Sequence, residues 1–260
     1  MKRSTFYYHL SRSSIPDKYR TLKDKIISVY DRNLGRYGYR RITLTLRQQG
    51  VAVNHKTVSK LMKQCGIKCM VRVKKYRSYK GEVGRIAPNL LQRDFHACQP
   101  NVKLVTDVTE FALFGEKRYL SPVMDLYNGE VLGYTISEHP NLKMVTDMLN
   151  AVTERLPEGA MAIVHSDQGW QYQNRFYQNM LREKGLVQSM SRKGNCLDNA
   201  VMENFFGLLK SELLYLRKFS SMAEFVSELK KYINYYNNDR IKIKLNGMSP
   251  VSFRTQTVQT

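Results

Sequence analysis

The sequence lacks the long apolar segments that would place a chain in a membrane. No stretch approaches eighteen consecutive apolar residues, the length that indicates a transmembrane helix. The N-terminus is basic, but it has no apolar run of the kind that forms a signal peptide. We therefore predict no membrane partner and expect the protein in the cytoplasm.

Cysteine is also scarce, and its spacing indicates no metal site. The four cysteines are Cys65, Cys69, Cys98 and Cys196. Cys65 and Cys69 stand close together, but no histidine lies near them, which argues against zinc. Free thiols are the simpler interpretation, and they agree with a cytoplasmic location.

Acidic residues are rare in the first part of the chain. Residues 1–100 contain 23 Lys and Arg against 5 Asp and Glu, whereas residues 101–260 contain 19 against 17. Because a solvated surface usually mixes both signs, this excess indicates a polyanionic partner. Nucleic acid is the usual partner of that kind, and its phosphates would make binding sensitive to salt. Charge alone does not separate DNA from RNA.

Residues 1–80 predict a small basic all-α domain. Apolar spacing indicates one helix over 17–31, a second that is stopped by Gly50, and a third that Asn54 caps and Gly66 ends. Three short helices with a basic last member resemble a helix-turn-helix, whose final helix enters a major groove. The alternative is a helical bundle with a merely solvated basic face. The side chains expected on DNA are Arg40, Arg41, His55, Lys56, Lys60 and Lys63, with Lys74 and Lys75 on a strand or extended basic arm.

Residues 81–99 predict a linker, because glycine, proline and charge are mixed there, and residues 100–260 form the second predicted domain. Its pattern is α/β. Strands are expected over 102–111, 119–126, 131–137, 161–166 and 186–190, and helices over about 141–155, 173–184, 199–213 and 221–237. This order is typical of an RNase H-like mixed five-stranded sheet with flanking helices. The other candidate, a doubly wound nucleotide-binding fold, would need a glycine-rich phosphate loop, which the sequence lacks.

Three carboxylates stand at positions where this fold would bring them to one edge of the sheet. Asp107 lies in the alternating first strand, and Asp167 follows the apolar run 161–164. Glu203 lies in the helix that Asp198 or Asn199 is expected to cap. Thirty-five residues separate Asp167 from Glu203.

That helix is predicted to be amphipathic. Its apolar stripe is made of Met202, Phe205, Phe206, Leu209 and Leu213. Beside the stripe, one face carries Asn199, Glu203, Gly207 and Lys210. One side of the helix can therefore enter a core while a carboxylate and a lysine point at the same place.

The motifs together resemble those of DDE transposases with a retroviral-integrase-like core. They are Thr106-Asp107-Val108-Thr109, His165-Ser166-Asp167-Gln168-Gly169, Ser191-Arg192-Lys193-Gly194-Asn195, Asp198-Asn199-Ala200 with Glu203, and Tyr235-Tyr236-Asn237 with Arg240. More narrowly, the chain resembles the second-frame product of bacterial insertion sequences whose transposase is made from two overlapping reading frames. The resemblance covers nearly the whole chain.

The resemblance implies metal-dependent nicking of DNA at the element's ends, followed by strand transfer. Asp107 would bridge two Mg²⁺ ions, and Asp167 and Glu203 would each hold one, with Mn²⁺ as a possible substitute. Double-stranded DNA, as element ends and as target, is the implied substrate of a protein associated with the nucleoid. A homo-oligomer on DNA is expected, with the upstream-frame product as a fusion or partner. Two alternatives are a DNA-binding regulator with an inert RNase H-like domain and a nuclease that cuts without joining.

Further residues near the acids admit two roles each. Lys210 points toward the acids and either binds a DNA phosphate or stays in solvent. Arg192, Lys193 and Asn195 form a loop that either clamps DNA or is mobile. His165 and Asn199 are candidate DNA contacts, although a structural histidine is an equal alternative for His165.

The remaining candidates are aromatic or acidic. Trp170 and Tyr172 either stack on unpaired bases or fill the core, and we favour the core for Trp170. Asp125, Asp147 and Asp198 are interpreted as turn or cap residues. The terminal motif around Tyr235 and Arg240 receives no role from the sequence.

Overall fold

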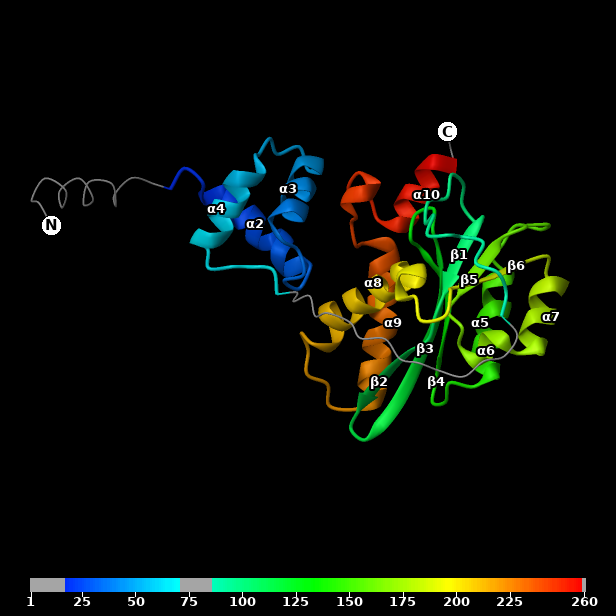
Figure 1. Ribbon diagram of the computed structural model, residues 1–260. Helices are drawn as coiled ribbons and strands as arrows, with labels where there is room; N and C mark the ends of the chain where they lie inside the picture. The colour runs from blue at the N-terminus through cyan, green and yellow to red at the C-terminus, as the bar shows by residue number, and fades with distance from the viewer. Residues whose placement is uncertain (1–16, 71–85, 259–260) are drawn as a thin grey trace, which may run out of the picture. The chain divides into compact units, whose positions relative to one another are not determined.

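The computed structural model describes residues 17–70 and 86–258, and the chain divides into two compact units, Met1–Val71 and Arg72–Thr260 (Figure 1). Lys74 and Lys75 lie outside the described residues. No helix within the described residues is long and apolar enough to cross a membrane.

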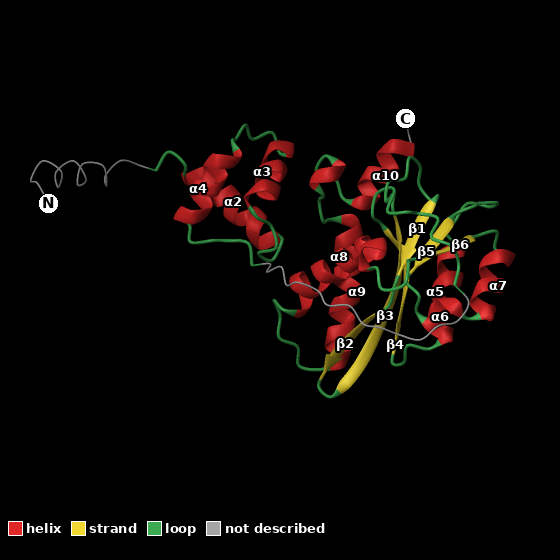
Figure 2. Ribbon diagram, viewed as in Figure 1, coloured by secondary structure: helices red, strands yellow, loops and turns green. Residues whose placement is uncertain are grey.

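The smaller unit contains the three expected helices, α2 (Arg20–Arg32), α3 (Tyr39–Gln48) and α4 (His55–Gln64) (Figure 2). Each helix turns its apolar residues inward, including the fully buried Ile26, Ile42 and Val58. Asn54 caps α4 as predicted, because its side chain accepts a hydrogen bond from the Lys56 N–H at 2.8 Å. The basic residues of α4 remain on the outside.

The larger unit is built on one mixed sheet. Its strands are β1 (Lys103–Thr106), β2 (Thr109–Leu113), β3 (Glu116–Asp125), β4 (Val131–Ser137), β5 (Ile163–Ser166) and β6 (Val187–Met190). β1 and β2 both pair antiparallel with β3, and β4 pairs antiparallel with the other edge of β3. β5 lies parallel to β1, and β6 lies parallel to β5. This order confirms the RNase H-like fold.

The prediction of five strands was wrong by one, because the expected first strand is broken at Asp107 and Val108. The pairings Thr106–Val123 and Thr109–Leu120 belong to one register, which places Asp107 opposite Pro122. Proline has no N–H to donate to a neighbouring strand. The sheet therefore has six strands, with β1 and β2 separated at the acid itself.

Helices cover both faces of the sheet. On one face, α5 (Leu142–Thr153), α6 (Trp170–Gln173) and α7 (Arg175–Glu183) pack against Leu104 and Val123 (Figure 1). On the other face, α8 (Ala200–Leu209) and α9 (Met222–Asn238) pack against Val105 and Met124. Alternate residues of one strand thus serve two separate cores.

Residues 86–99, within the range predicted as a linker, pack against the rest of the larger unit. Leu91 is 2% exposed and joins the core under α8 and α9. The Leu90 N–H donates to Ser189 Oγ at 2.9 Å, which ties this segment to β6. We call residues 86–99 the strap.

The terminal motif holds α9 and the end of the chain in place. α8 continues as a π-helical segment, Lys210–Leu214, in which Glu212 is 1% exposed. Arg240 meets Glu212 with two hydrogen bonds, of 2.7 and 2.9 Å, and Asn237 exchanges two hydrogen bonds with the backbone of Val131. The last helix, α10 (Pro250–Val258), sends Arg254 to Glu130 beside the β3–β4 turn. The motif is therefore structural.

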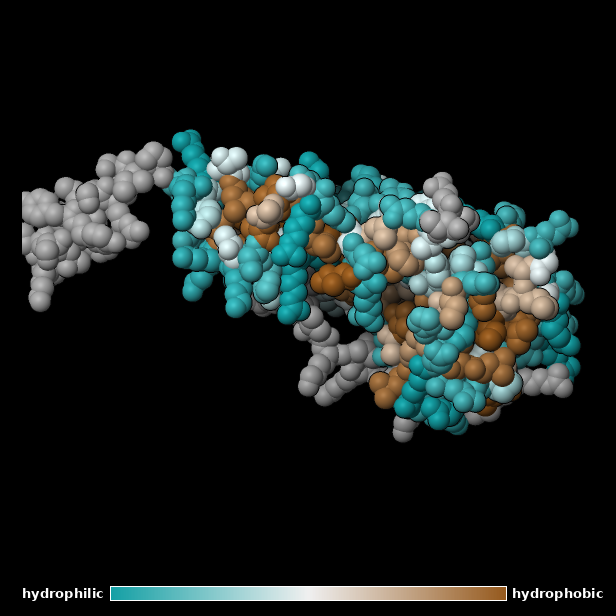
Figure 3. All heavy atoms as spheres, turned by 90° about the horizontal axis from the view of Figure 1, so that it is seen from above, coloured by the Kyte–Doolittle hydropathy of each residue, from teal (hydrophilic) through white to brown (hydrophobic). Residues whose placement is uncertain are grey.

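Apolar and polar surfaces are interspersed on the view from above. Hydrophilic side chains cover much of the outer edge of the larger unit, with hydrophobic patches between them (Figure 3). In the smaller unit, hydrophilic side chains surround a hydrophobic centre (Figure 3). The buried apolar side chains form a separate core in each unit, for example Ile26 and Ile42 in the smaller unit and Val105 and Phe205 in the larger one.

Candidate active site

Asp107 and Asp167 lie level with each other on neighbouring parallel strands. The register pairs Val105 with His165, so two further residues bring Asp107 beside Asp167. Neighbouring strands are about 5 Å apart. Two carboxylates sixty positions apart in the sequence therefore lie side by side, each directly after the last residue of its strand.

Glu203 approaches the same edge from the first turn of α8. Met202 and Phe205, on either side of it, are buried against the sheet and fix the rotation of the helix. Glu203 itself is only partly buried. Its negative charge is felt at Asp107, where it contributes to raising the pKa of that carboxyl.

The three carboxylates are poorly compensated. Burial raises the pKa of Asp107 well above its ordinary value, and the charges of Asp167 and Glu203 raise it further. The hydrogen bond that Asp107 accepts from the Val108 N–H at 2.7 Å acts in the opposite direction and lowers this pKa. Burial also raises the pKa of Asp167, which accepts the Gly169 N–H at 2.9 Å, and burial raises the pKa of Glu203. A bound cation would relieve this repulsion.

The donor set fits a hard divalent ion, although the acids do not enclose one point. Carboxylate oxygens are the ligands that Mg²⁺ prefers. Within 17–70 and 86–258, no three His, Cys, Asp or Glu side chains converge closely enough to surround a single ion. Two ions about 4 Å apart, by contrast, are held by carboxylates spread along the pair.

Lys210 carries a positive charge that acts on this cluster, because it lowers the pKa of Asp107. Burial lowers the pKa of its ammonium, while Glu110 and Asp107 act to raise it. Its Nζ lies 5.6 Å from the centre of the Phe111 ring, on the strand that follows Asp107. Lys210 is thus on the side of the helix that the sequence predicts. Glu110, by contrast, is exposed and accepts hydrogen bonds from Lys117 and Tyr119.

His165 has no exposed surface, so its predicted contact with DNA is not possible in this conformation. Its Nε2 donates to the Asp198 carbonyl at 3.0 Å, and its Nδ1 accepts from Ser189 Oγ at 2.8 Å. Burial lowers the pKa of the ring, which favours the neutral form. The structural alternative for His165 applies, because the ring joins β5, β6 and the approach to α8.

Neither residue expected to cap α8 does so. The Asp198 carboxylate is buried and binds Arg192 and Arg93, and Arg192 lowers its pKa. Asn199 is 4% exposed and donates to the Thr106 carbonyl at 3.4 Å, which leaves little of it for DNA. A short 3₁₀ turn, Cys196–Asn199, leads into the helix instead.

The other predicted contacts lie on surfaces. In the smaller unit Arg40, His55, Lys56, Lys60 and Lys63 are exposed, and Arg41 is partly exposed. In the loop before α8, Arg192 and Lys193 are exposed, while Asn195 accepts a hydrogen bond from Arg93 at 3.0 Å. Arg93 was not among the predicted contacts, because it lies in the predicted linker.

The structure exposes one of the two aromatic candidates and buries the other. Trp170, which we predicted in the core, is 55% exposed three residues after Asp167. Tyr172 is 1% exposed and packs against Tyr177. α6 is a single turn, so Trp170 at its start has no helical face to bury.

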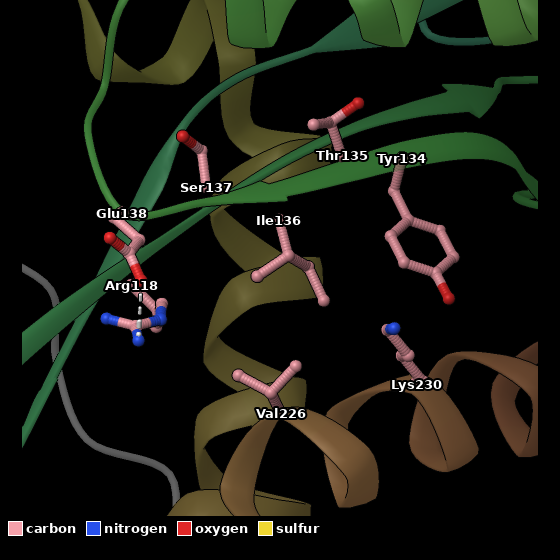
Figure 4. Close-up of a pocket in the computed structure, with 8 residues that line it drawn as sticks. All are labelled: Arg118, Tyr134, Thr135, Ile136, Ser137, Glu138, Val226 and Lys230. Atoms are coloured by element: carbon pink, nitrogen blue, oxygen red, sulfur yellow. Dashed lines mark ion pairs between the residues drawn. The ribbon is translucent and has the colours of Figure 1, made fainter. Parts of the chain in front are cut away.

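A surface groove in the larger unit is separate from the acids. It has a volume of about 620 Å³ and lies between β4 and α9, with Ile136 and Val226 at its centre (Figure 4). Arg118 and Glu138 form an ion pair at one end, and Lys230 faces Tyr134 at the other (Figure 4). None of the three acids lines this groove.

Three family matches cover most of the chain. Two integrase core domain families match residues 97–196 and residues 203–258. An HTH-like domain family matches residues 17–75. These matches coincide with the sheet that carries the acids and with the three-helix unit.

Relatives at high identity are named as transposases. The putative transposase InsK of insertion sequence IS150 from Escherichia coli is 56% identical, over 98% of this chain and 90% of its own length. A transposase-like protein of Haemophilus influenzae is 51% identical, over 84% and 100%. Transposase InsF of insertion sequence IS3A from Escherichia coli is 32% identical, over 98% and 89%. Similarity of this extent, through both units, shows that the chain belongs to the insertion-sequence transposases, which have an integrase-type polynucleotidyl transferase core.

Proposed function

We propose that Asp107, Asp167 and Glu203 form the acidic triad with which this transposase cuts and joins DNA. The observation that carries the proposal is the electrostatic coupling of the three side chains. Each comes from a different element, and the charges of the other two raise the pKa of Asp107. Carboxylates that repel one another in a partly buried site are suited to holding cations.

Two Mg²⁺ ions are the cofactor that this donor set would take. Asp107, at the strand break between the other two acids, would contact both ions, and Asp167 and Glu203 would each contact one. When bound, such ions supply Lewis-acid stabilisation of the attacking and leaving oxygens. Mn²⁺, which also accepts oxygen ligands, would substitute.

The reaction has two transfers at phosphorus. In the first, a water oxygen bonds to the phosphorus at the element's end, and the phosphorus–O3′ bond breaks to leave a 3′-OH. In the second, that 3′-OH attacks another phosphodiester, and a new 3′-hydroxyl leaves. Lys210, close to the acids, would hold a non-bridging phosphate oxygen as a point charge.

The smaller unit would deliver the DNA. Its exposed basic residues lie on and around α4, the helix that corresponds to the groove-reading member of a helix-turn-helix. Joining two element ends needs two active sites, so we expect at least two copies on the DNA. The upstream-frame product is the expected fusion or partner.

A strand-transfer assay tests the assignment. Labelled, pre-nicked element-end oligonucleotides are incubated with the protein and Mg²⁺ or Mn²⁺, and joined products are separated on a denaturing gel. We expect product from the wild type and none from Glu203→Gln. A Glu203→Gln variant that joins DNA normally would exclude the triad.

The same assay separates this function from its alternatives. A regulator with an inert core would retain DNA in a gel shift and give no metal-dependent product. A simple nuclease would release cut strands without joined ones. If neither wild type nor variant gives product, repeating the assay with the fused upstream frame distinguishes an inert core from one that needs its partner.

A further inference from the structure

Two arginines from distant segments meet on one buried carboxylate. The Asp198 side chain has no exposed surface and accepts five hydrogen bonds of 2.9 to 3.0 Å. The donors are Asn89 and Arg93 in the strap and the backbone and guanidinium of Arg192 after β6. Asp198 therefore sets the direction of both guanidinium groups.

The outer sides of the two guanidinium groups face solvent. The side chain of Arg93 is 43% exposed and that of Arg192 is 59% exposed. Arg192 uses Nε and Nη2 on Asp198, and Arg93 uses Nε on Asp198 and Nη2 on Asn195. Among the described residues the Nη1 group of each has no protein partner, and each such group carries two N–H donors. Four N–H donors on two partly exposed side chains are therefore left without a protein partner among the described residues.

The local charge is positive despite the buried acid. One arginine is enough to neutralise Asp198, so the second leaves a net positive charge. The exposed Lys193 adds another. An arrangement that served only to neutralise Asp198 would not need this excess.

The arginine pair is joined rigidly to two of the three acids. The Asp198 carbonyl accepts a hydrogen bond from His165, and Asp167 follows His165 by two residues on the same strand edge. In the other direction, Asp198 precedes Glu203 by five residues and leads directly into α8. A ligand that binds both arginines would therefore lie close to the acid cluster.

We propose that Arg93 and Arg192 together bind phosphates of the DNA backbone beside the cutting site, with Asp198 as the positioning residue that aligns them. A planar guanidinium with paired N–H groups matches phosphate oxygens, and prior alignment reduces the entropy lost on binding. DNA as the ligand rests on the proposed function. The strap thereby becomes part of the DNA-binding surface of the larger unit.

The test is the salt dependence of DNA binding by the full-length chain. Fluorescence anisotropy of a labelled duplex of about 30 base pairs is measured between about 50 and 250 mM KCl, where each neutralised phosphate contributes about 0.9 to the slope of log K against log salt. We expect Arg93→Ala and Arg192→Ala each to make this negative slope less steep by about 0.9, and the double variant by about 1.8. Arg182→Ala, on the exposed side of α7, is the matched control and should keep the wild-type slope.

Melting temperature, measured on the same variants, separates DNA contact from a purely structural role. A wild-type slope in the double variant, whether or not it melts earlier, would overturn the proposal. An equal fall in Arg182→Ala would also overturn it, because the effect would then belong to any surface arginine. The double Lys variant, Arg93→Lys with Arg192→Lys, should retain the slope, because the slope counts charge and not fork geometry.

This measurement does not depend on catalysis. It needs neither metal nor joined product, so a lowered slope would establish the phosphate contacts even if the strand-transfer assay failed. Conversely, a metal-dependent product with an unchanged slope would support the triad and reject the arginine pair.

Discussion

Two acidic regions of the larger unit differ in how their charge is compensated. One is the buried Glu212 in the π-helical segment, and the other contains the partly buried Asp107, Asp167 and Glu203. Glu212, in the π-helical segment, faces Arg240 with two hydrogen bonds and accepts a third from Tyr232 at 3.0 Å. Asp107 accepts a hydrogen bond from its neighbour Val108, and the negative charges of Asp167 and Glu203 repel it.

The difference separates acids that hold the fold from acids that are left reactive. Glu212 and Asp198 each bind an arginine in the folded chain, so their charge is satisfied without a ligand. The acids around Asp107 have Lys210 as the opposing cation that lowers the pKa of Asp107. Incomplete compensation, more than burial, marks the candidate active site.

The largest expected effect is on catalysis at the uncompensated cluster. Asp167→Asn should reduce strand-transfer rate by about 10³-fold or more, because losing an ion contact removes several kcal/mol of transition-state stabilisation. The measurement is the initial rate of joined product, with DNA affinity from gel shifts expected to stay within about twofold. Full activity in Asp167→Asn would mean that the uncompensated acids are not needed for strand transfer.

The next effect is on stability at the compensated pair. Arg240→Met should lower the free energy of unfolding by about 3–5 kcal/mol, because it leaves the Glu212 charge buried without its partner. Urea denaturation measures this loss. Glu212→Gln combined with Arg240→Met should recover most of it.

A matched control for that pair is Arg254→Met. Arg254 is 36% exposed where it meets Glu130, so water can replace it and the expected loss is about 1 kcal/mol. Equal losses in Arg240→Met and Arg254→Met would mean that burial does not decide the strength of these pairs.

A smaller effect of opposite sign is expected at Asp107. Because its pKa is raised in the folded protein, the native state binds more protons than the unfolded state above the ordinary value of 3.8, and stability falls as pH rises through that window. Without metal at pH 7, Asp107→Asn should therefore have a higher melting temperature than the wild type.

The pH and metal dependence check the cause of that gain. The difference between Asp107→Asn and wild type should vanish below the ordinary pKa, where both states are protonated. Added Mg²⁺ should raise the melting temperature of the wild type more than that of the variant. A variant that is less stable than wild type at every pH would contradict the repulsion described for the cluster.

The smallest effect is expected at Glu110, which lies three residues from Asp107 but is exposed. Glu110→Gln loses its surface contacts with Lys117 and Tyr119, which are worth about 0.5 kcal/mol or less. Strand-transfer rate should remain at the wild-type level. A large loss of product would place Glu110 among the functional acids.

The sequence predicted the strand that ends before Asp167 and the helix that carries Glu203, because strand alternation and helical spacing are local patterns. It did not predict the break at Asp107, since that depends on which strand residue Pro122 faces. Pairing register is set by the whole sheet, and no local pattern contains it.

Partners distant in the sequence explain the other differences. Asp198 is an unremarkable helix-cap candidate until Arg93, 105 residues earlier, is brought to it. Arg240 likewise meets Glu212 across 28 residues. The exposure of Trp170 was missed for another reason, because a one-turn helix has no periodicity to read.

The contacts of the β3–β4 hairpin determine when the larger unit can finish folding during synthesis. The N–H and the carbonyl of Val131 both form hydrogen bonds with the side chain of Asn237, 106 residues later. Glu130 likewise accepts a hydrogen bond from Arg254, 124 residues later. Contacts this distant in sequence are slow to form and cannot exist while the later segment is still in the ribosome. A chain cut short before Asn237 would therefore carry all three acids but lack the side chain that hydrogen-bonds the N–H and carbonyl of Val131 in β4.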